Sequence, residues 1–209
     1  MNADRAIQAR RSIRLRDCDY SYPGMYFVTI CTADRRCVFG KIEGGKVVLS
    51  PLGEVVEEEW LRTPSLRPYV ELDEHVTMPN HFHGVLIIRQ KGSDVAPAGT
   101  ARRAPTEEFG RPVARSLPTI VGAFKAAVTC APVHLGIKRR HAVWQRGYFE
   151  HIIRDEESLG RIREYIVNNP MRWEFDKENP DRTAEDEFDR WLSRFRSRPK
   201  VRKIDDPTD

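Results

Sequence analysis

The chain has 209 residues, of which 40% are hydrophobic and 32% charged, and its 35 lysines and arginines exceed its 31 aspartates and glutamates by four. This length and composition suit one folded domain with a substantial core and argue against wholesale disorder. No apolar run approaches the ~20 residues of a membrane helix, and the N-terminus lacks the apolar stretch of a signal peptide. The four cysteines form no Cys-x-x-Cys pair, which argues against a zinc knuckle or a disulfide scaffold. We therefore expect a cytoplasmic protein without a membrane span.

The predicted elements before residue 89 are, in chain order, a buried strand at 25–32, a hairpin turn at 44–45, a helix that begins at Ser50-Pro51, and strands at about 70–78 and 83–88. The strands are predicted from β-branched and aromatic residues, and the turn from its paired glycines. Serine as the N-cap followed by proline favours the start of a helix. A tight corner at Pro79-Asn80 joins the last two strands.

Residues 89–116 are rich in alanine, proline, glycine, serine and arginine without periodicity, which predicts a mobile loop. The later predicted elements are a helix from Ser116, a short strand over 147–153, a helix capped by Asp155 that ends before Pro170, and a docking helix near 188–195. This order predicts an α+β sandwich with helices on one face of an antiparallel sheet. The other face of the sheet would then be free to meet a ligand.

The charged residues are unevenly distributed along the chain. Residues 1–16 contain five arginines and one acid, and residues 190–203 contain seven bases and no acid. Acids gather at 54–59 and 185–189, and we expect them to lie away from a functional site. Segregated positive charge favours binding to a phosphate backbone, because each neutralised phosphate releases counterions. Solvated faces and flexible ends are the alternative explanation.

The motif His81-Phe82-His83-Gly84 lies at the start of a predicted strand. Side chains alternate between the faces of a strand, so His81 and His83 point the same way while Phe82 points into the core. Two imidazoles in this arrangement can bind one divalent metal ion, and Gly84 allows close approach of a backbone or ligand. Two solvent-facing histidines are the alternative.

Tyr165 and Asn169 are four residues apart, and so lie on the same side of the last long predicted helix, at the edge of its apolar stripe. A core tyrosine with its hydroxyl in water is the ordinary explanation of such a position. The alternative is that Tyr165 is a nucleophile and that Asn169 gives its amide oxygen to the same metal ion as the histidines.

Taken together, these motifs resemble those of the REP-associated tyrosine transposases, a branch of the single-stranded-DNA transposases that share a His-hydrophobic-His (HUH) motif. The matching blocks keep their order and spacing from about residue 10 to 175, and they are Tyr26–Cys31, Met78–Gly84, Trp144–Arg154 and Tyr165–Pro170. The resemblance implies a ferredoxin-like or RRM-like core with His81 and His83 as metal ligands. It further implies that Tyr165 is the catalytic nucleophile and that Asn169 is a third metal ligand.

The implied activity is metal-dependent cleavage and rejoining of single-stranded DNA at hairpin, REP-like palindromic sequences through a 5′-phosphotyrosine intermediate. A free tyrosine has a pKa near 10, so its attack requires activation, which Mg²⁺ or Mn²⁺ can support. The phosphotyrosine ester retains the energy of the broken bond, so that a second 3′-hydroxyl can reverse the step. The alternatives are a non-mobilising DNA-binding regulator of palindromic repeats and an initiator of rolling-circle replication. The protein is expected to act as a monomer or homodimer near the nucleoid.

Several basic residues are candidate DNA contacts, with simple solvation as the alternative for each. They are Arg11, Arg14, Arg16, Lys125, Lys138, Arg139, Arg140, Arg146 and Arg154. His151 and Arg154 also match a recurrent His-x-x-Arg block of the family, for which a structural role and a phosphate contact are equally good explanations. We divide the chain into a basic arm (1–24), a catalytic domain (25–175) and a C-terminal helix with a basic tail (176–209).

Overall fold

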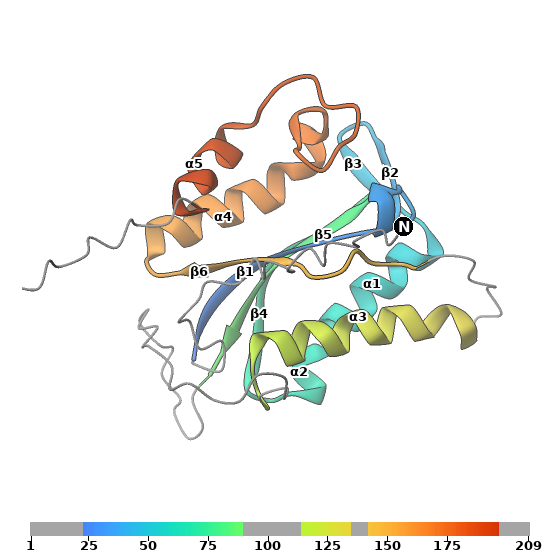
Figure 1. Cartoon of the computed structure of the whole chain (residues 1–209), viewed down its shortest axis with the longest axis vertical. Coiled ribbons are helices and arrows are strands. Elements are labelled where there is room, and N and C mark those ends of the chain that lie inside the picture. Colours follow the sequence, from blue (N-terminus) through green and yellow to red (C-terminus); the bar gives the residue numbers. More distant parts are fainter. Residues whose placement is uncertain (1–22, 90–113, 135–141, 197–209) are drawn as a thin grey trace, which may run out of the picture.

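The computed structural model describes residues 23–89, 114–134 and 142–196, and in these ranges an antiparallel sheet lies between two layers of helices (Figure 1). The strands of this sheet, in spatial order, are β4 (Val70–Met78), β5 (His81–Ile88), β1 (Gly24–Cys31) and β6 (Phe149–Ile153). A separate hairpin consists of β2 (Gly40–Glu43) and β3 (Lys46–Leu49). The α+β class and the antiparallel sheet predicted from the sequence are confirmed.

The helices begin largely where the capping residues predict. They are α1 (Pro51–Leu61), α2 (Thr63–Leu66), α3 (Leu117–His134), α4 (Glu156–Asn168) and α5 (Glu187–Arg196), with 3-10 segments η1 (Ala33–Arg35) and η2 (Asn169–Phe175). The Ser50 hydroxyl accepts a hydrogen bond from the Gly53 amide at 3.1 Å, and Asp155 accepts one from the Ser158 amide at 2.7 Å. These bonds satisfy amide groups that the first helical turn leaves unpaired, so both predicted starts are confirmed.

One hydrophobic core lies between the sheet and the layer formed by α1 and α3 (Figure 1). The Trp60 ring of α1 packs 4.7 Å from the Phe82 ring and 5.2 Å from the Phe124 ring of α3, measured between centroids. A Cβ atom on Gly84 would lie 2.7 Å from Trp60 Cζ2. The close approach that Gly84 allows is therefore that of a core tryptophan, and the absence of a side chain is a packing requirement.

A second core lies on the opposite face of the sheet, under α4 and α5. It contains Phe27 of β1, Ile162 and Ile166 of α4, and Leu192 of α5. The prediction of helices on one face only, with the other face free, is therefore wrong. The reason is that β1 is apolar on both sides, since Phe27 and its neighbour Val28 are both fully buried, as in strands covered on both faces.

The element boundaries differ little from those predicted, although β5 begins at His81 instead of residue 83. The sequence did not predict α2 or η2. Most of the predicted mobile loop (90–113), most of the basic arm and residues 197–209 lie outside the described residues. The three-part division of the chain thus stays a prediction. In the part of the chain that the structure describes, no helix combines the length and apolarity needed to cross a membrane.

Candidate active site

The two histidines of the motif are buried side by side on β5. His81 and His83 are each 0% exposed, and their ring centroids are 4.4 Å apart. Phe82 points to the other face, where it contacts Trp60, so the predicted alternation is confirmed. Solvent-facing histidines are excluded.

The Nδ1 atom of each histidine has a hydrogen-bonding partner, which leaves the Nε2 atoms to face the site. His83 Nδ1 lies 2.9 Å from Thr29 Oγ1 on the paired strand β1, and His81 Nδ1 lies 2.9 Å from Asn80 Oδ1. An outer polar partner on one ring nitrogen, with the other nitrogen turned inward, is typical of metal-ligating histidines.

A carboxylate completes the group. Asp176, which directly follows η2, places its Oδ2 atom 3.7 Å from His81 Nε2 and 3.9 Å from His83 Nε2. One potential ligand atom from each of the three residues lies within 4.8 Å of the others. Two imidazoles and one carboxylate therefore converge on a single point in the protein interior.

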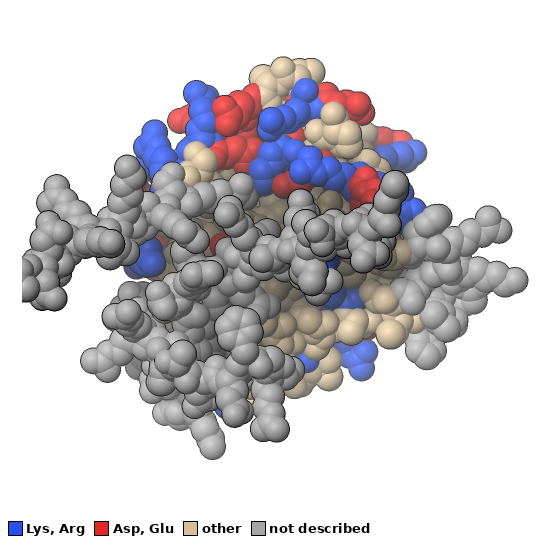
Figure 2. All heavy atoms as spheres, in the orientation of Figure 1, with Lys and Arg blue, Asp and Glu red and all other residues tan. Residues whose placement is uncertain are grey.

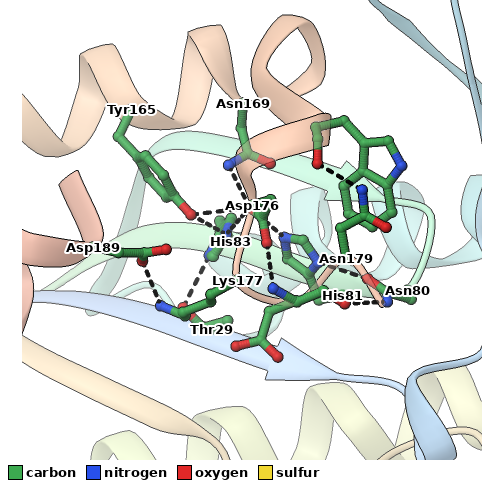
Figure 3. A network of polar contacts seen from close by, with 12 residues as sticks. Thr29, Asn80, His81, His83, Tyr165, Asn169, Asp176, Lys177, Asn179 and Asp189 are labelled. Carbon is green, nitrogen blue, oxygen red and sulfur yellow. Dashed lines mark hydrogen bonds and ion pairs between the residues drawn. The ribbon is translucent and has the colours of Figure 1, made fainter. Parts of the chain in front are cut away.

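Tyr165 and Asn169 reach the same carboxylate from α4 and the start of η2 (Figure 3). The Tyr165 hydroxyl donates to Asp176 Oδ2 at 3.1 Å and lies 3.2 Å from His83 Nε2, while Asn169 Nδ2 donates to Asp176 Oδ2 at 2.8 Å. The structure thus brings together the four residues that the sequence singled out. Asn169 Oδ1 lies in the same interior, and its role as a metal ligand stays a prediction.

The protonation states of these groups follow from their burial. Burial lowers the pKa of His81 to about 3 and also lowers that of His83, in both cases against the opposing charge of Asp176. Burial alone would raise the pKa of Asp176, but the histidines and the Asn169 hydrogen bond lower it overall. Burial and then the Asp176 charge raise the pKa of Tyr165 well above its usual value. The resting site therefore has neutral imidazoles and a neutral phenol, beside a carboxylate that hydrogen bonds from Tyr165, Asn169 and the Glu178 amide keep ionised.

This arrangement fits a divalent cation. Among the described residues, His81 Nε2 and Asn169 Oδ1 are buried atoms without a hydrogen-bond partner. Buried polar atoms are nearly always satisfied, and the unpaired His81 Nε2 lies 3.7 Å from the Asp176 carboxylate, so this position suits a positively charged occupant. Neutral imidazoles and carboxylates are also the protonation states in which these side chains bind metal ions.

The nucleophile candidate lies beneath α5. Tyr165 is 3% exposed, and its ring stacks on Phe188 at a centroid distance of 3.8 Å and an interplanar angle of 12°. The Phe188 ring therefore covers one face of the Tyr165 ring.

Two acidic residues lie at the start of α5, and the expectation that the acids at 185–189 lie away from the site is wrong. Asp186 pairs with Arg172 at 2.9 Å, Asp189 pairs with Lys177 at 3.2 Å, and both acids help to raise the pKa of Tyr165. They lie there because α5 folds back onto α4, which the charge pattern does not reveal. Figure 2 shows acidic and basic side chains interspersed over the region where α4 and α5 lie in Figure 1.

The structure describes three of the nine predicted DNA contacts. Lys125 on α3 donates to the Gln145 and Gly147 carbonyl oxygens, each at 2.8 Å, and so supports the segment before β6. Arg146 and Arg154 are exposed on this segment and at the end of β6. The remaining predicted contacts lie outside the described residues, and they are Arg11, Arg14, Arg16, Lys138, Arg139 and Arg140.

Sequence reasoning missed Asp176, Asn80 and Thr29 as members of the site. Asp176 lies in an irregular segment without periodicity, so no pattern indicates which way it faces. Asn80 offered a usable signal, because a polar residue in a tight turn directly before a proposed metal ligand is well placed to bond with it.

The chain is similar to known proteins in sequence and in structure. No protein-family model matches the sequence. An uncharacterized protein of Haemophilus influenzae is 40% identical over 175 residues, which cover 82% of this chain and 93% of that protein. The two proteins belong to one family.

A solved structure of a REP-associated tyrosine transposase bound to a REP hairpin matches 95% of this chain and 93% of its own, with a TM-score of 0.50 and 21% identity. The chain therefore has the α+β fold of that transposase. The family resemblance stated from the sequence motifs is confirmed at the level of the fold. The present chain also has the pair of buried histidines that the motif predicts.

Proposed function

We propose that the protein is a metal-dependent DNA strand transferase that cuts and rejoins single-stranded DNA at hairpin sequences, with Tyr165 as the nucleophile. The observation that carries the proposal is the position of the Tyr165 hydroxyl, 3.1 Å from Asp176 Oδ2 and 3.2 Å from His83 Nε2. A phenol that contacts one imidazole and a carboxylate, with a second imidazole beside them in the same buried site, is suited to covalent catalysis on a phosphodiester. The likeness to a transposase bound to a REP hairpin supports hairpin DNA as the partner.

His81, His83 and Asp176 would hold the cation, with Asn169 Oδ1 as a further ligand. Two nitrogen donors favour Mn²⁺ over Mg²⁺, which prefers oxygen ligands, although either ion would serve the chemistry. When bound, the ion supplies positive charge that offsets the charge developing on the phosphate.

In the cleavage step, the Tyr165 oxygen forms a bond to phosphorus, and the bond from phosphorus to the 3′-oxygen breaks. The phenolic proton lies on the hydrogen bond to Asp176 Oδ2, with His83 Nε2 as the second nearby acceptor. The proton finally resides on the departing 3′-oxygen, so the products are a 5′-phosphotyrosine ester and a 3′-hydroxyl. Because Tyr165 is neutral at rest, this proton transfer is part of the reaction's cost.

A DNA-binding regulator that does not cut is the second candidate function. The observation that favours it is the covered nucleophile, since the Phe188 ring lies directly over Tyr165. The intact group of histidines, carboxylate and tyrosine favours the enzyme, because binding alone requires none of these buried polar contacts.

The two functions are separated by trapping the covalent intermediate. The protein is incubated with a labelled hairpin that has single-stranded flanks, in Mn²⁺ or Mg²⁺, and is then resolved on a denaturing gel. We expect a protein–DNA adduct from the wild type and none from Tyr165→Phe. Tyr69→Phe is the matched control, because Tyr69 is half-buried and lies against Arg115, remote from the histidines, and it should react like the wild type. Hairpin binding without any adduct would favour the regulator.

A further inference from the structure

Asn80, in the turn between β4 and β5, is fully buried and joins three segments of the chain. Its Oδ1 atom lies 2.9 Å from His81 Nδ1, and its Nδ2 atom donates to the Glu178 carbonyl at 2.7 Å and to the Arg35 carbonyl at 3.1 Å. A carboxamide has two donor hydrogens, and both are used here. Because carbonyl groups only accept hydrogen bonds, the orientation of the Asn80 amide is fixed.

The first consequence concerns the tautomer of His81. The Asn80 oxygen can only accept, so His81 Nδ1 must carry the proton and donate it. In a neutral imidazole the other nitrogen then holds a lone pair. That nitrogen, Nε2, faces Asp176 Oδ2 at 3.7 Å.

The second consequence concerns the segment that carries Asp176. The Glu178 amide donates to Asp176 Oδ1 at 2.7 Å, while the Glu178 carbonyl accepts from Asn80. Arg35 strengthens the same connection, since it pairs with the Glu178 carboxylate at 3.3 Å and donates to the Lys177 carbonyl at 3.2 Å. One side-chain amide thus orients a histidine and also anchors the loop that supplies the carboxylate.

We infer that Asn80 is a positioning residue that sets the metal affinity of the site by coupling the tautomer of His81 to the docking of the segment 176–178. It touches none of the reacting atoms and acts through His81 Nδ1 and the Glu178 carbonyl. The inference rests on the proposed function only in that the metal ion serves the reaction. Loss of an outer partner of a metal ligand typically lowers metal affinity 10- to 100-fold.

The test uses the full-length protein and three variants. Mn²⁺ affinity is measured by electron paramagnetic resonance titration, and histidine tautomers are read from ¹⁵N shifts in metal-free protein. Asn80→Ala should weaken Mn²⁺ binding about 10- to 100-fold and mix the His81 tautomers. Asn80→Asp keeps an acceptor for His81 but has no donor for the Glu178 carbonyl. It should therefore retain the tautomer while hydrogen exchange of the Glu178 amide accelerates.

Thr29→Val is the matched control, because it removes the partner of His83 Nδ1 and should leave the tautomer of His81 unchanged. A wild-type His81 ring protonated on Nε2 would overturn the inference without any variant. So would an Asn80→Ala protein that keeps both its tautomer and, within twofold, its Mn²⁺ affinity. If circular dichroism shows that Asn80→Ala is unfolded, the inference is tested by Asn80→Asp and by the ¹⁵N shifts of His81 in the wild type. These readouts need no DNA, so an absent covalent adduct would refute the proposed function and leave the positioning role intact.

Discussion

Replacing Asp176 with asparagine removes the only negative charge from the three residues that converge on the site. Its two carboxylate oxygens accept from Tyr165 and Asn169 on one side and from the Glu178 amide on the other. An asparagine side chain has one acceptor oxygen, so one of these groups of donors loses its partner. We expect the metal-free variant to lose about 1–3 kcal/mol of its free energy of unfolding.

The effect on metal binding is larger and separately measurable. At a Mn²⁺ concentration 100 times its Kd, the ion stabilises the wild type by about 2.7 kcal/mol, which raises Tm by roughly 5–10 °C for a chain of this size. Loss of an outer partner of a metal ligand weakens metal binding by up to about 100-fold, and loss of a direct charged ligand should weaken it at least as much. At the same Mn²⁺ concentration the variant then gains only about 0.4 kcal/mol, or roughly 1 °C.

Differential scanning calorimetry with and without Mn²⁺ measures both shifts, each against its own metal-free baseline. Asp73→Asn is the matched control, because Asp73 pairs with Arg163 at 2.8 Å, and neither belongs to the metal group. It should keep the full shift. If Asp176→Asn also kept the full shift, Asp176 would not be a ligand and the proposed site would be wrong.

Two further perturbations test the packing at Gly84 and the burial of His151. Gly84→Ala places a Cβ atom 2.7 Å from Trp60 Cζ2 and should lower the free energy of unfolding, measured in urea, by about 1–3 kcal/mol. Gly160→Ala is the control, because there is open space at its Cβ in α4, and it should leave the free energy of unfolding unchanged or raise it. Equal losses in the two variants would refute the packing argument. Burial, with Arg154 adding to it, lowers the pKa of His151 to about 4. Because the unfolded histidine titrates near 6.5, it takes up a proton below that pH while the folded protein keeps the ring neutral. The free energy of unfolding is therefore unaffected above pH 6.5 and falls as the pH falls toward 4, by at most about 1.4 kcal/mol per pH unit. His151→Gln should flatten that loss between pH 7 and 4.5, and an unchanged slope would contradict the assignment.

Periodicity and capping predicted the strands and helices that form the frame of the site. The alternation of His81, Phe82 and His83 and the spacing of Tyr165 and Asn169 are local properties, because each pair lies on one regular element. Local patterns therefore gave the correct facing of these side chains.

The remaining features depend on contacts between distant segments. Asp176 lies in an irregular segment whose position is determined by bonds to Asn80 and Arg35, more than 90 residues away in the chain. The docking of α5 over the sheet depends on Phe188 meeting Tyr165, which no single-segment pattern encodes. Because α5 docks there, Asp186 and Asp189 lie near Tyr165, and the face of the sheet that was expected to be open is covered.

The central claim, that Tyr165 attacks DNA, is tested most directly by mapping the adduct. Trypsin cleavage after Arg163 and Arg172 releases residues 164–172, in which Tyr165 is the only tyrosine. After reaction with a hairpin in Mn²⁺ and nuclease trimming, tandem mass spectrometry should find this peptide carrying a 5′-nucleotide phosphate on Tyr165. A nucleotide on any other residue, or an adduct that persists in Tyr165→Phe, would contradict the account.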